Sequence, residues 1–206
     1  MASKQLSYAD GPVIWVDCEM TGLDPDKDKI LEIAVLITNG NLDLVDDGVE
    51  FIIRTDKASL DGMDEWCTKQ HGRSGLTKAC LKSPHSLEDV SKAVLAYIKK
   101  WVPQRRTGIL AGNSVHADRA FLVKQMPEIV EWLHYRLFAS HVSSVKELSR
   151  RWYPQLGIPK LSESNHRRAA LDDIRGSIKE LQWYRRNIFI PPIQPLPTEV
   201  AGKTAT

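Results

Sequence analysis

The chain has 206 residues, of which 42% are hydrophobic and 26% are charged, and its formal net charge is +2. This length fits one domain with a substantial core, or one domain and a tail. No apolar run approaches the roughly 20 residues that span a bilayer, so we expect no transmembrane segment and no membrane partner. The small net charge excludes a molecule that attracts polyanions over its whole surface.

Three cysteines, Cys18, Cys67 and Cys80, form an odd and widely spaced set. The set has neither the even number of a disulfide framework nor the paired spacing of a zinc site, so it indicates a reducing compartment. The first residues, MASKQLSYADGP, carry neither the apolar stretch of a secretory signal nor the arginine-rich pattern of a transit peptide. We therefore expect an intracellular protein, cytoplasmic or mitochondrial, or a mature form whose presequence is absent.

The first half of the chain predicts three strands. Residues 13–16 (VIWV), 30–38 (ILEIAVLIT) and 49–54 (VEFIIR) are short runs rich in β-branched side chains. The stretch between the second and third runs contains Asn39 and Gly40, and Asn-Gly is a strong hairpin signal. We therefore expect an antiparallel meander.

The second half alternates helices and strands. Residues 86–102 predict a helix that opens with Ser86 and Asp89 in a capping-box arrangement. Its apolar face consists of Val90, Val94, Tyr97, Ile98 and Trp101. Residues 109–113 predict a fourth strand, 118–124 a helix, 137–145 a fifth strand and 171–189 the clearest helix. A meander followed by such alternation indicates an α/β domain with a mixed sheet.

Three segments of the chain differ in composition. We expect an N-terminal extension over residues 1–11 and a single folded domain over residues 12–189. Residues 190–206 contain the run IPPIQPLP and a small polar ending. This composition is typical of a flexible tail.

Two carboxylates end the first predicted strand. Asp17 and Glu19 are two positions apart, so their side chains share one face of the strand, whereas Cys18 points to the opposite face and toward the expected core. Carboxylate oxygens are the ligands that Mg²⁺ and Mn²⁺ prefer, and two of them can hold two ions about 4 Å apart. By itself, however, such a pair is more often just two exposed charges.

Further acidic residues and a histidine follow in order. Asp118 comes after a short apolar strand and begins a helix, and His166 precedes Asp172 and Asp173 at the start of the last helix. Each has a simpler explanation, since aspartate in a first turn complements the helix dipole and a lone histidine is usually a surface or packing residue. The ordered set, in contrast, is typical of a metal-dependent nuclease.

With these residues in place, the sequence resembles the oligoribonucleases, a group of DEDDh exonucleases with a ribonuclease-H-like fold. The resemblance runs from about residue 12 to residue 189 and is carried by the motifs DCEMTGLDP, KILEIAVLIT, MDEWCTKQHGRSGL, GNSVHADRAFL, LHYR, VSSVKELSRRWYP and HRRAALDDIRGSIKEL. It implies a mixed five-stranded sheet, an antiparallel meander plus parallel strands, flanked by helices. It also favours a fungal or other eukaryotic member.

The resemblance implies a 3′-to-5′ exoribonuclease that cuts short RNA, dinucleotides above all, into nucleoside 5′-monophosphates. Two divalent ions, Mg²⁺ or Mn²⁺, would be held by four carboxylates: Asp17, Glu19, Asp118 and Asp173. His166 matches the general base, a role that suits an imidazole with an ordinary pKa of about 6.5.

The substrate-binding residues that the resemblance implies form two groups. An apolar pair, Leu23 and Trp66, would stack on the substrate bases, and a polar cap of Ser114, Arg136 and Ser143 would enclose the 5′ phosphate. Taken singly, a tryptophan is more often a packing residue and an arginine more often a solvated charge. Tyr135 matches a residue donated across a homodimer interface.

Two departures from the family pattern keep alternatives open. Six residues separate His166 from Asp173, where the family has four. In the segment YRLFASHVSS, His141 stands where the family usually has aspartate, after two additional residues. A catalytically weak protein that binds dinucleotides, and an exonuclease acting on longer RNA or DNA ends, are therefore alternatives to the short-RNA enzyme.

Overall fold

The computed structural model describes residues 4–138, 141–157 and 170–189. Its secondary structure alternates as the sequence predicts, with additional short helices. The elements are η1 (Tyr8–Asp10), β1 (Val13–Met20), β2 (Ile30–Thr38), β3 (Val49–Ile52), α1 (Lys57–Asp61), α2 (Glu65–Ser74), α3 (Leu76–Lys82), α4 (Leu87–Trp101), β4 (Ile109–Ala111), α5 (His116–Gln125), α6 (Pro127–Trp132), β5 (Leu137–Phe138), α7 (His141–Trp152) and α8 (Ala170–Asn187).

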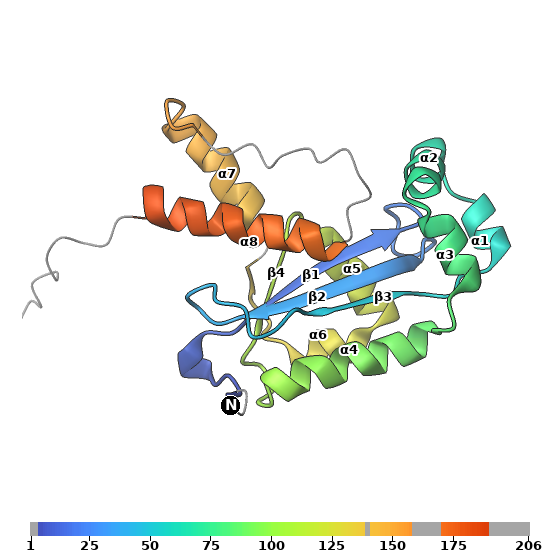
Figure 1. Ribbon diagram of the computed structural model, residues 1–206, viewed down its shortest axis with the longest axis horizontal. Helices are drawn as coiled ribbons and strands as arrows, with labels where there is room; N and C mark the ends of the chain where they lie inside the picture. The colour runs from blue at the N-terminus through green and yellow to red at the C-terminus, as the bar shows by residue number, and fades with distance from the viewer. Residues whose placement is uncertain (1–3, 139–140, 158–169, 190–206) are drawn as a thin grey trace, which may run out of the picture.

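Across these described ranges, five strands form one sheet in the order β3-β2-β1-β4-β5. β1 pairs antiparallel with β2, and β2 with β3, so the predicted meander is confirmed. β4 runs parallel to β1, and β5 parallel to β4. The fold class predicted from the sequence, a mixed α/β sheet flanked by helices, is therefore confirmed (Figure 1).

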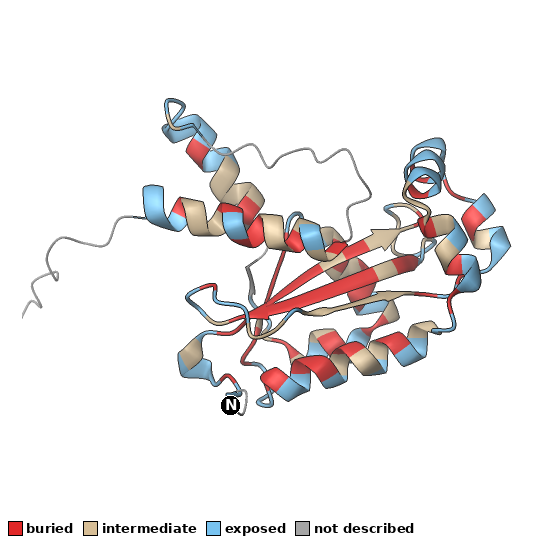
Figure 2. Ribbon diagram, in the orientation of Figure 1, coloured by how far each residue is buried: buried red, intermediate tan, exposed pale blue. Residues whose placement is uncertain are grey.

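Helices cover both faces of this sheet, so the residues of β1 and β2 are buried on both sides. Alternate residues of β1, such as Ile14 and Val16, face a cluster that includes side chains of α4, α5 and α6. The other residues, such as Val13 and Trp15, face a cluster with α7 and α8. Figure 2 shows the buried residues concentrated in the central strands and on the inner sides of these helices. This arrangement places α8 over the face that carries Asp17 and Glu19.

A smaller cluster lies under α1, α2 and α3. Leu60, Met63 and Cys67 pack there with Leu31 of β2. All three cysteines are free and buried in the described structure, in agreement with the expectation of no disulfide framework. Within the described ranges, no helix is both long and apolar enough to span a bilayer.

Two predictions of local structure need correction. The predicted fifth strand, residues 137–145, is a strand only over Leu137–Phe138, and α7 begins at His141. Val142 and Val145 are three positions apart, a spacing that suits one face of a helix, and both pack on the cluster under α8. The predicted strand 13–16 also extends to Met20, so the acidic pair lies within β1.

The Asn-Gly segment does not form a tight two-residue hairpin. Asn39 Oδ1 instead accepts hydrogen bonds from the backbone N–H groups of Asn41 and Asp43, which closes a local turn. The Gly40 N–H donates to the Asp10 carbonyl at 2.8 Å. The connection between β2 and β3 is therefore a wider loop, anchored to the N-terminal segment.

Candidate active site

The first two carboxylates lie on β1 beyond the point where β4 ends. β4 pairs with β1 only as far as Trp15, which stands opposite Ala111. Asp17 and Glu19 are half-buried and follow Trp15 on alternate positions, so they share its face, beneath α8. The edge of β1 beside them is consequently open to residues that follow β4 in the chain.

Asp118 of α5 fills this opening. Its Oδ1 atom accepts a hydrogen bond from the backbone N–H of Cys18 at 2.9 Å, and the residue is only 5% exposed. This contact satisfies a backbone donor that β4 does not reach. Gly112 allows the approach, because a Cβ atom there would lie 2.6 Å from the carbonyl oxygen of Val16. The turn after β4 therefore brings Asp118 directly beside the acidic pair.

The fourth predicted carboxylate comes from the first turn of α8. Asp173 lies close enough to Asp17 for its charge to raise the pKa of Asp17. Asp172, one position earlier, is instead exposed and forms an ion pair with Arg175 at 3.3 Å. The two neighbouring aspartates of this helix thus face different surroundings, one toward the β1 carboxylates and one toward solvent.

The ionised carboxylates of this site repel one another. Burial, followed by the charges of Asp118, Glu19, Asp173 and Glu32, raises the pKa of Asp17 well above its ordinary value. Burial is also the main reason that the pKa of Asp118 rises from 3.8 to about 6, and it raises the pKa of Glu19. Like charges gathered in a poorly solvated site need a compensating cation.

The donor set suits a hard divalent cation. The gathered ligands are all carboxylates, and oxygen ligands of this kind favour Mg²⁺ or Mn²⁺ over softer metals. Over the described part of the chain, no three His, Cys, Asp or Glu side chains already converge as ligands on one point. Ion binding therefore requires the carboxylates to move toward one another, which the cation's charge would favour.

Two residues of this site were missed in the sequence. Glu32 on β2 stands directly opposite Glu19 in the strand register and adds a further negative charge near Asp17. His71 of α2 is 2% exposed; its Nε2 lies 2.9 Å from the Met20 carbonyl, and its Nδ1 lies 3.9 Å from Oε2 of Glu19. A carbonyl only accepts, so Nε2 carries a proton and Nδ1 faces the carboxylate. The charge of His71 lowers the pKa of Glu19.

The predicted base-stacking pair is exposed at the same end of the sheet. Leu23 is 82% exposed and Trp66 is 69% exposed, values that packing residues do not have. Leu23 lies in the loop after β1, where Asp28 accepts hydrogen bonds from the Thr21 hydroxyl and the Asp24 N–H. Glycine at position 22 suits this loop, since a Cβ atom there would displace the Asp28 carboxylate that accepts these hydrogen bonds. This bonded loop holds an apolar side chain out in solvent.

Trp66 stands in the first turn of α2, whose start is fixed by Asp64. The Asp64 side chain caps the helix by accepting a hydrogen bond from the Cys67 N–H at 2.7 Å. The contact of His71 with Met20 then ties the same helix to the end of β1. Figure 1 shows α2 beside the tip of the β1 arrow, so Trp66 belongs to the carboxylate end of the molecule.

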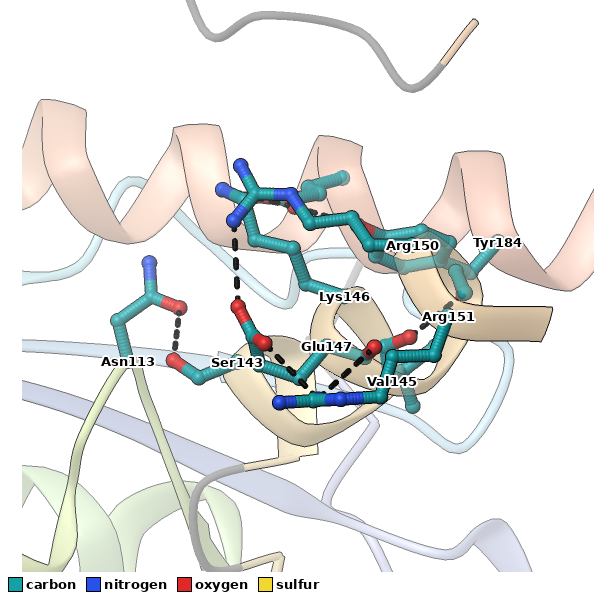
Figure 3. A network of polar contacts seen from close by, with 10 residues as sticks. Asn113, Ser143, Val145, Lys146, Glu147, Arg150, Arg151 and Tyr184 are labelled. Carbon is teal, nitrogen blue, oxygen red and sulfur yellow. Dashed lines mark hydrogen bonds and ion pairs between the residues drawn. The ribbon is translucent and has the colours of Figure 1, made fainter. Parts of the chain in front are cut away.

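The residues of the predicted phosphate cap come from three segments. Ser143 in α7 donates a hydrogen bond to Asn113, the neighbour of Ser114 (Figure 3). Ser114 has a positive φ of 51°, a strained conformation for a residue with a side chain. The structure thus brings Ser143 next to the Ser114 turn.

Arg136 and Tyr135 lie together on the surface. Both are exposed, Tyr135 by 73%, and the Arg136 guanidinium carbon lies 5.6 Å from the centre of the Tyr135 ring. The Arg136 N–H donates to His134 Nδ1, which stacks against Tyr135 at 4.5 Å. No measured contact joins this pair to Ser143 in the described structure, and residues 139–140 between them lie outside it.

The predicted general base is not placed. His166 lies outside the described residues, as does all of the segment 158–169. Its role as the base therefore stays a prediction, as does the consequence of its wider spacing from Asp173.

Known proteins resemble this chain both in sequence and in fold. The exonuclease family RNase_T matches residues 14–181. The chain is 46% identical over 184 residues to a probable oligoribonuclease of Schizosaccharomyces pombe, covering 89% of this chain and 71% of that protein. It is 45% identical over 187 residues to an oligoribonuclease of Halorhodospira halophila, covering 91% and 100%. It is 49% identical over 179 residues to a mitochondrial oligoribonuclease of Bos taurus, covering 86% and 73%.

Solved structures of exonuclease I share the fold. One from Methylocaldum szegediense has a TM-score of 0.63 at 15% identity, and a zinc-bound complex of the E. coli enzyme with single-stranded DNA has a TM-score of 0.61 at 13% identity. Each match covers 86% of this chain but only 41% of the other, so this chain spans about two fifths of those proteins. At such low identity the likeness shows the fold alone.

Proposed function

The chain belongs to the oligoribonuclease family of exonucleases, and from that premise we propose that it is a 3′-to-5′ exoribonuclease acting on short RNA. Its substrates are dinucleotides above all, and its products are nucleoside 5′-monophosphates. The observation that carries the proposal is the gathering of Asp17, Glu19, Asp118 and Asp173 from β1, α5 and α8 into one electrostatically coupled group.

The four carboxylates are proposed to hold two divalent ions, Mg²⁺ or Mn²⁺. When bound, such ions lower the pKa of a coordinated water and neutralise the departing 3′ oxygen. The Cys18 N–H holds one oxygen of Asp118 at 2.9 Å, which leaves the other oxygen available for ligation. His71 faces Glu19 across 3.9 Å and orients that carboxylate.

His166 is assigned the role of general base. It removes a proton from the attacking water, whose oxygen forms the new bond to phosphorus, while the bond from phosphorus to the 3′ oxygen breaks. The released 3′ oxygen takes up a proton from solvent. This step yields one nucleoside 5′-monophosphate and a shortened chain.

The exposed apolar pair and the polar cap account for the choice of substrate. Stacking of bases on Leu23 and Trp66 contributes on the order of 1–3 kcal/mol per base and is nearly independent of sequence. Arg136 and the hydroxyls of Ser114 and Ser143 are proposed to bind the 5′ phosphate through charge-assisted hydrogen bonds. A cap closed on that phosphate leaves no path for a longer strand.

We also propose a homodimer in which Tyr135 contributes to the partner's site. Its 73% exposure leaves the ring available for a second chain. For the compartment we propose the mitochondrion or the cytoplasm; relatives from Bos taurus and Mus musculus are mitochondrial oligoribonucleases.

The direct test measures mononucleotide release from a 5′-labelled diribonucleotide with Mg²⁺ or Mn²⁺. We expect complete conversion to mononucleotides and far slower degradation of long RNA. Efficient degradation of long RNA without turnover of the dinucleotide would instead favour an enzyme acting on longer ends. Dinucleotide binding without turnover at any metal concentration would favour the binding protein.

Three variants test the carboxylate assignment. Asp17→Ala and Asp173→Ala should each lower turnover at least about 100-fold, since each removes a ligand of ions that supply several kcal/mol of transition-state stabilisation. Asp172→Ala is the matched control, because Asp172 lies on the same turn but pairs with Arg175 at the surface. Equal activity of the Asp172 and Asp173 variants would contradict the assignment.

A further inference from the structure

A chain of hydrogen bonds links the predicted phosphate cap to the helix that carries Asp173. The Ser143 hydroxyl donates to Asn113 Oδ1 at 3.3 Å, and Asn113 Nδ2 donates to the Ser177 hydroxyl at 2.6 Å. The Ser177 hydroxyl in turn donates to the backbone carbonyl of Asp173 at 3.0 Å. Figure 3 shows the Asn113 amide reaching toward Ser143 from the turn after β4. Three elements, α7, this turn and α8, are thereby joined through one side chain.

The direction of each bond in this chain is fixed by the number of protons. A hydroxyl has a single proton, and the buried Ser177 gives its proton to the Asp173 carbonyl, so it accepts from the Asn113 amide. The other end of that amide is then its oxygen, which accepts from Ser143. Asn113 is the one member that bonds to both helices.

The turn that holds Asn113 leaves it little freedom. Gly112 before it approaches the Val16 carbonyl too closely for any side chain, and Ser114 after it has a φ of 51°. A residue between two such constraints keeps its orientation only where the surrounding structure enforces it. The backbone therefore presents the Asn113 amide to both helices at once.

Binding of a phosphate at Ser143 should alter this series of hydrogen bonds. The single Ser143 proton cannot be donated to Asn113 and to a phosphate oxygen at the same time. Once it turns to the phosphate, the Asn113 oxygen loses this donor, so the amide that bonds to Ser177, and through it to the first turn of α8, is held less firmly. Phosphate binding at Ser143 thus affects the hydrogen bond that holds the backbone of Asp173.

We propose that Asn113 is a positioning residue that couples binding of the substrate's 5′ phosphate by Ser143 to the placement of Asp173. This inference rests on the proposed function, because it takes Ser143 as part of the phosphate cap and Asp173 as a metal ligand. Under this proposal, binding of the 5′ phosphate both adds to substrate affinity and adjusts the position of a metal ligand.

The first measurement compares the full chain with Asn113→Ala on two substrates, the 5′-phosphorylated dinucleotide pApA and its dephosphorylated form ApA. The variant should lower the advantage of pApA in kcat/KM by about 3- to 10-fold, the effect of one lost hydrogen bond, with part of the loss in kcat. Ser143→Ala should lower it by a similar factor, and the double variant by no more than either alone. Asn187→Ala, which removes an amide donor from the far end of α8, should match the parent.

The second measurement titrates Mn²⁺ by calorimetry without turnover. Asn113→Ala and Ser177→Ala should each weaken Mn²⁺ binding about 3- to 10-fold, because both release the first turn of α8. Ser143→Ala removes the same donor from Asn113 that phosphate binding draws away, so it should shift the Mn²⁺ affinity in the direction in which a bound 5′ phosphate shifts it in the parent. In the parent, a saturating non-hydrolysable analogue of pApA should alter the Mn²⁺ affinity more than the matching analogue of ApA does, and Asn113→Ala should remove that difference. Ser177→Ala is a small change within a helix, so it tests the hydrogen bonds from Asn113 to Asp173 even if Asn113→Ala lowers the melting temperature.

The outcomes separate this inference from the proposed function. Independent, multiplying effects of Asn113→Ala and Ser143→Ala, or equal losses on pApA and ApA, would overturn the coupling while leaving the exonuclease intact. A parent that hydrolyses neither dinucleotide would count against the proposed function instead. In that case the Mn²⁺ titrations test the coupling by themselves. If the 5′-phosphorylated dinucleotide changes the Mn²⁺ affinity of Asn113→Ala as much as that of the parent, the coupling is overturned as well.

Discussion

Asp118 combines a structural contact with a charge that the fold disfavours. Its Oδ1 atom holds the Cys18 N–H, which stabilises the ionised form, yet burial dominates and brings the pKa from 3.8 to about 6. In the metal-free protein this carboxyl therefore binds a proton more tightly when folded than when unfolded. The same residue that is needed for metal binding makes the protein without metal less stable once it ionises.

This shift predicts how stability depends on pH. Between pH 3.8 and about 6 the folded state retains the Asp118 proton that the unfolded state has lost, so the free energy of unfolding falls as pH rises through this window. Asparagine cannot ionise. The stability of Asp118→Asn relative to the parent should therefore increase from pH 4.5 to pH 7.5, by on the order of 2 kcal/mol. Urea denaturation in a chelator at both pH values measures this difference.

Asp10→Asn is the control for that experiment. Hydrogen bonds from the Ser7 hydroxyl and N–H lower the pKa of Asp10 to about 2, so its carboxyl is ionised in both states at either pH. Its difference from the parent should stay the same at pH 4.5 and 7.5. If the Asp118→Asn difference also stays constant, the buried carboxyl does not titrate in this window.

At this scale the sequence indicates the residues whose chemistry is evident from type and order. Asp17, Glu19 and Asp118 follow predicted strands and are recognisable as candidate ligands. His71 and Asn113 are not, because each acts through a partner distant in the chain: the Met20 carbonyl for one, the hydroxyls on α7 and α8 for the other. The spacing of residues in the sequence does not reveal contacts between positions so far apart in the chain.

Among the elements, α7 shows why local pattern alone misplaces a boundary. The sequence predicts a strand over residues 137–145, but β5 is only Leu137–Phe138, since β4 beside it has three residues and pairs with it over two. α4 and α8 are long and amphipathic, so both helices are predicted, and the apolar face predicted for α4 is the one that is buried. α7 depends instead on tertiary contacts with α8.

One of these contacts is a buried ion pair. Glu180 of α8 is 2% exposed; it accepts a hydrogen bond from the Tyr184 hydroxyl at 2.7 Å and lies 3.2 Å from Nζ of Lys146 in α7. Lys146→Met should destabilise the protein by about 2–4 kcal/mol, since it leaves a buried carboxylate without its cation. Glu180→Gln should cost only about 1 kcal/mol, because Gln still accepts from Tyr184 and the partly exposed Lys146 can reach water. Chemical denaturation gives both values.

The double variant checks the cause. Lys146→Met with Glu180→Gln removes both charges and should recover part of the stability that Lys146→Met loses. A Lys146→Met cost below that of Glu180→Gln would contradict the buried pair as the element that joins α7 to α8. Because Ser143 lies in α7 only three residues before Lys146, loosening α7 should also raise KM for pApA.

For the whole molecule, one exposed aromatic side chain, Tyr135, lies just before β5, at the end of the sheet opposite the carboxylates. Tyr135 stacks on His134 and lies beside Arg136, while most of its ring remains in solvent. A single protomer gives this ring no further partner among the contacts measured in the described ranges. In the proposed homodimer, symmetry would place two such rings at equivalent positions, one for each partner's site.

Mixing two inactive variants tests this arrangement. Asp17→Ala keeps Tyr135 but lacks a metal ligand, and Tyr135→Ala keeps its carboxylates but lacks the donated ring. After subunit exchange in an equal mixture, half of the dimers are mixed and each has one complete site, so about a quarter of the parental activity should return. Light scattering should give a mass of twice 23.3 kDa for the parent. A mixture no more active than its two components, at a dimeric mass, would show that Tyr135 serves its own protomer; a mass of one chain would exclude the dimer itself.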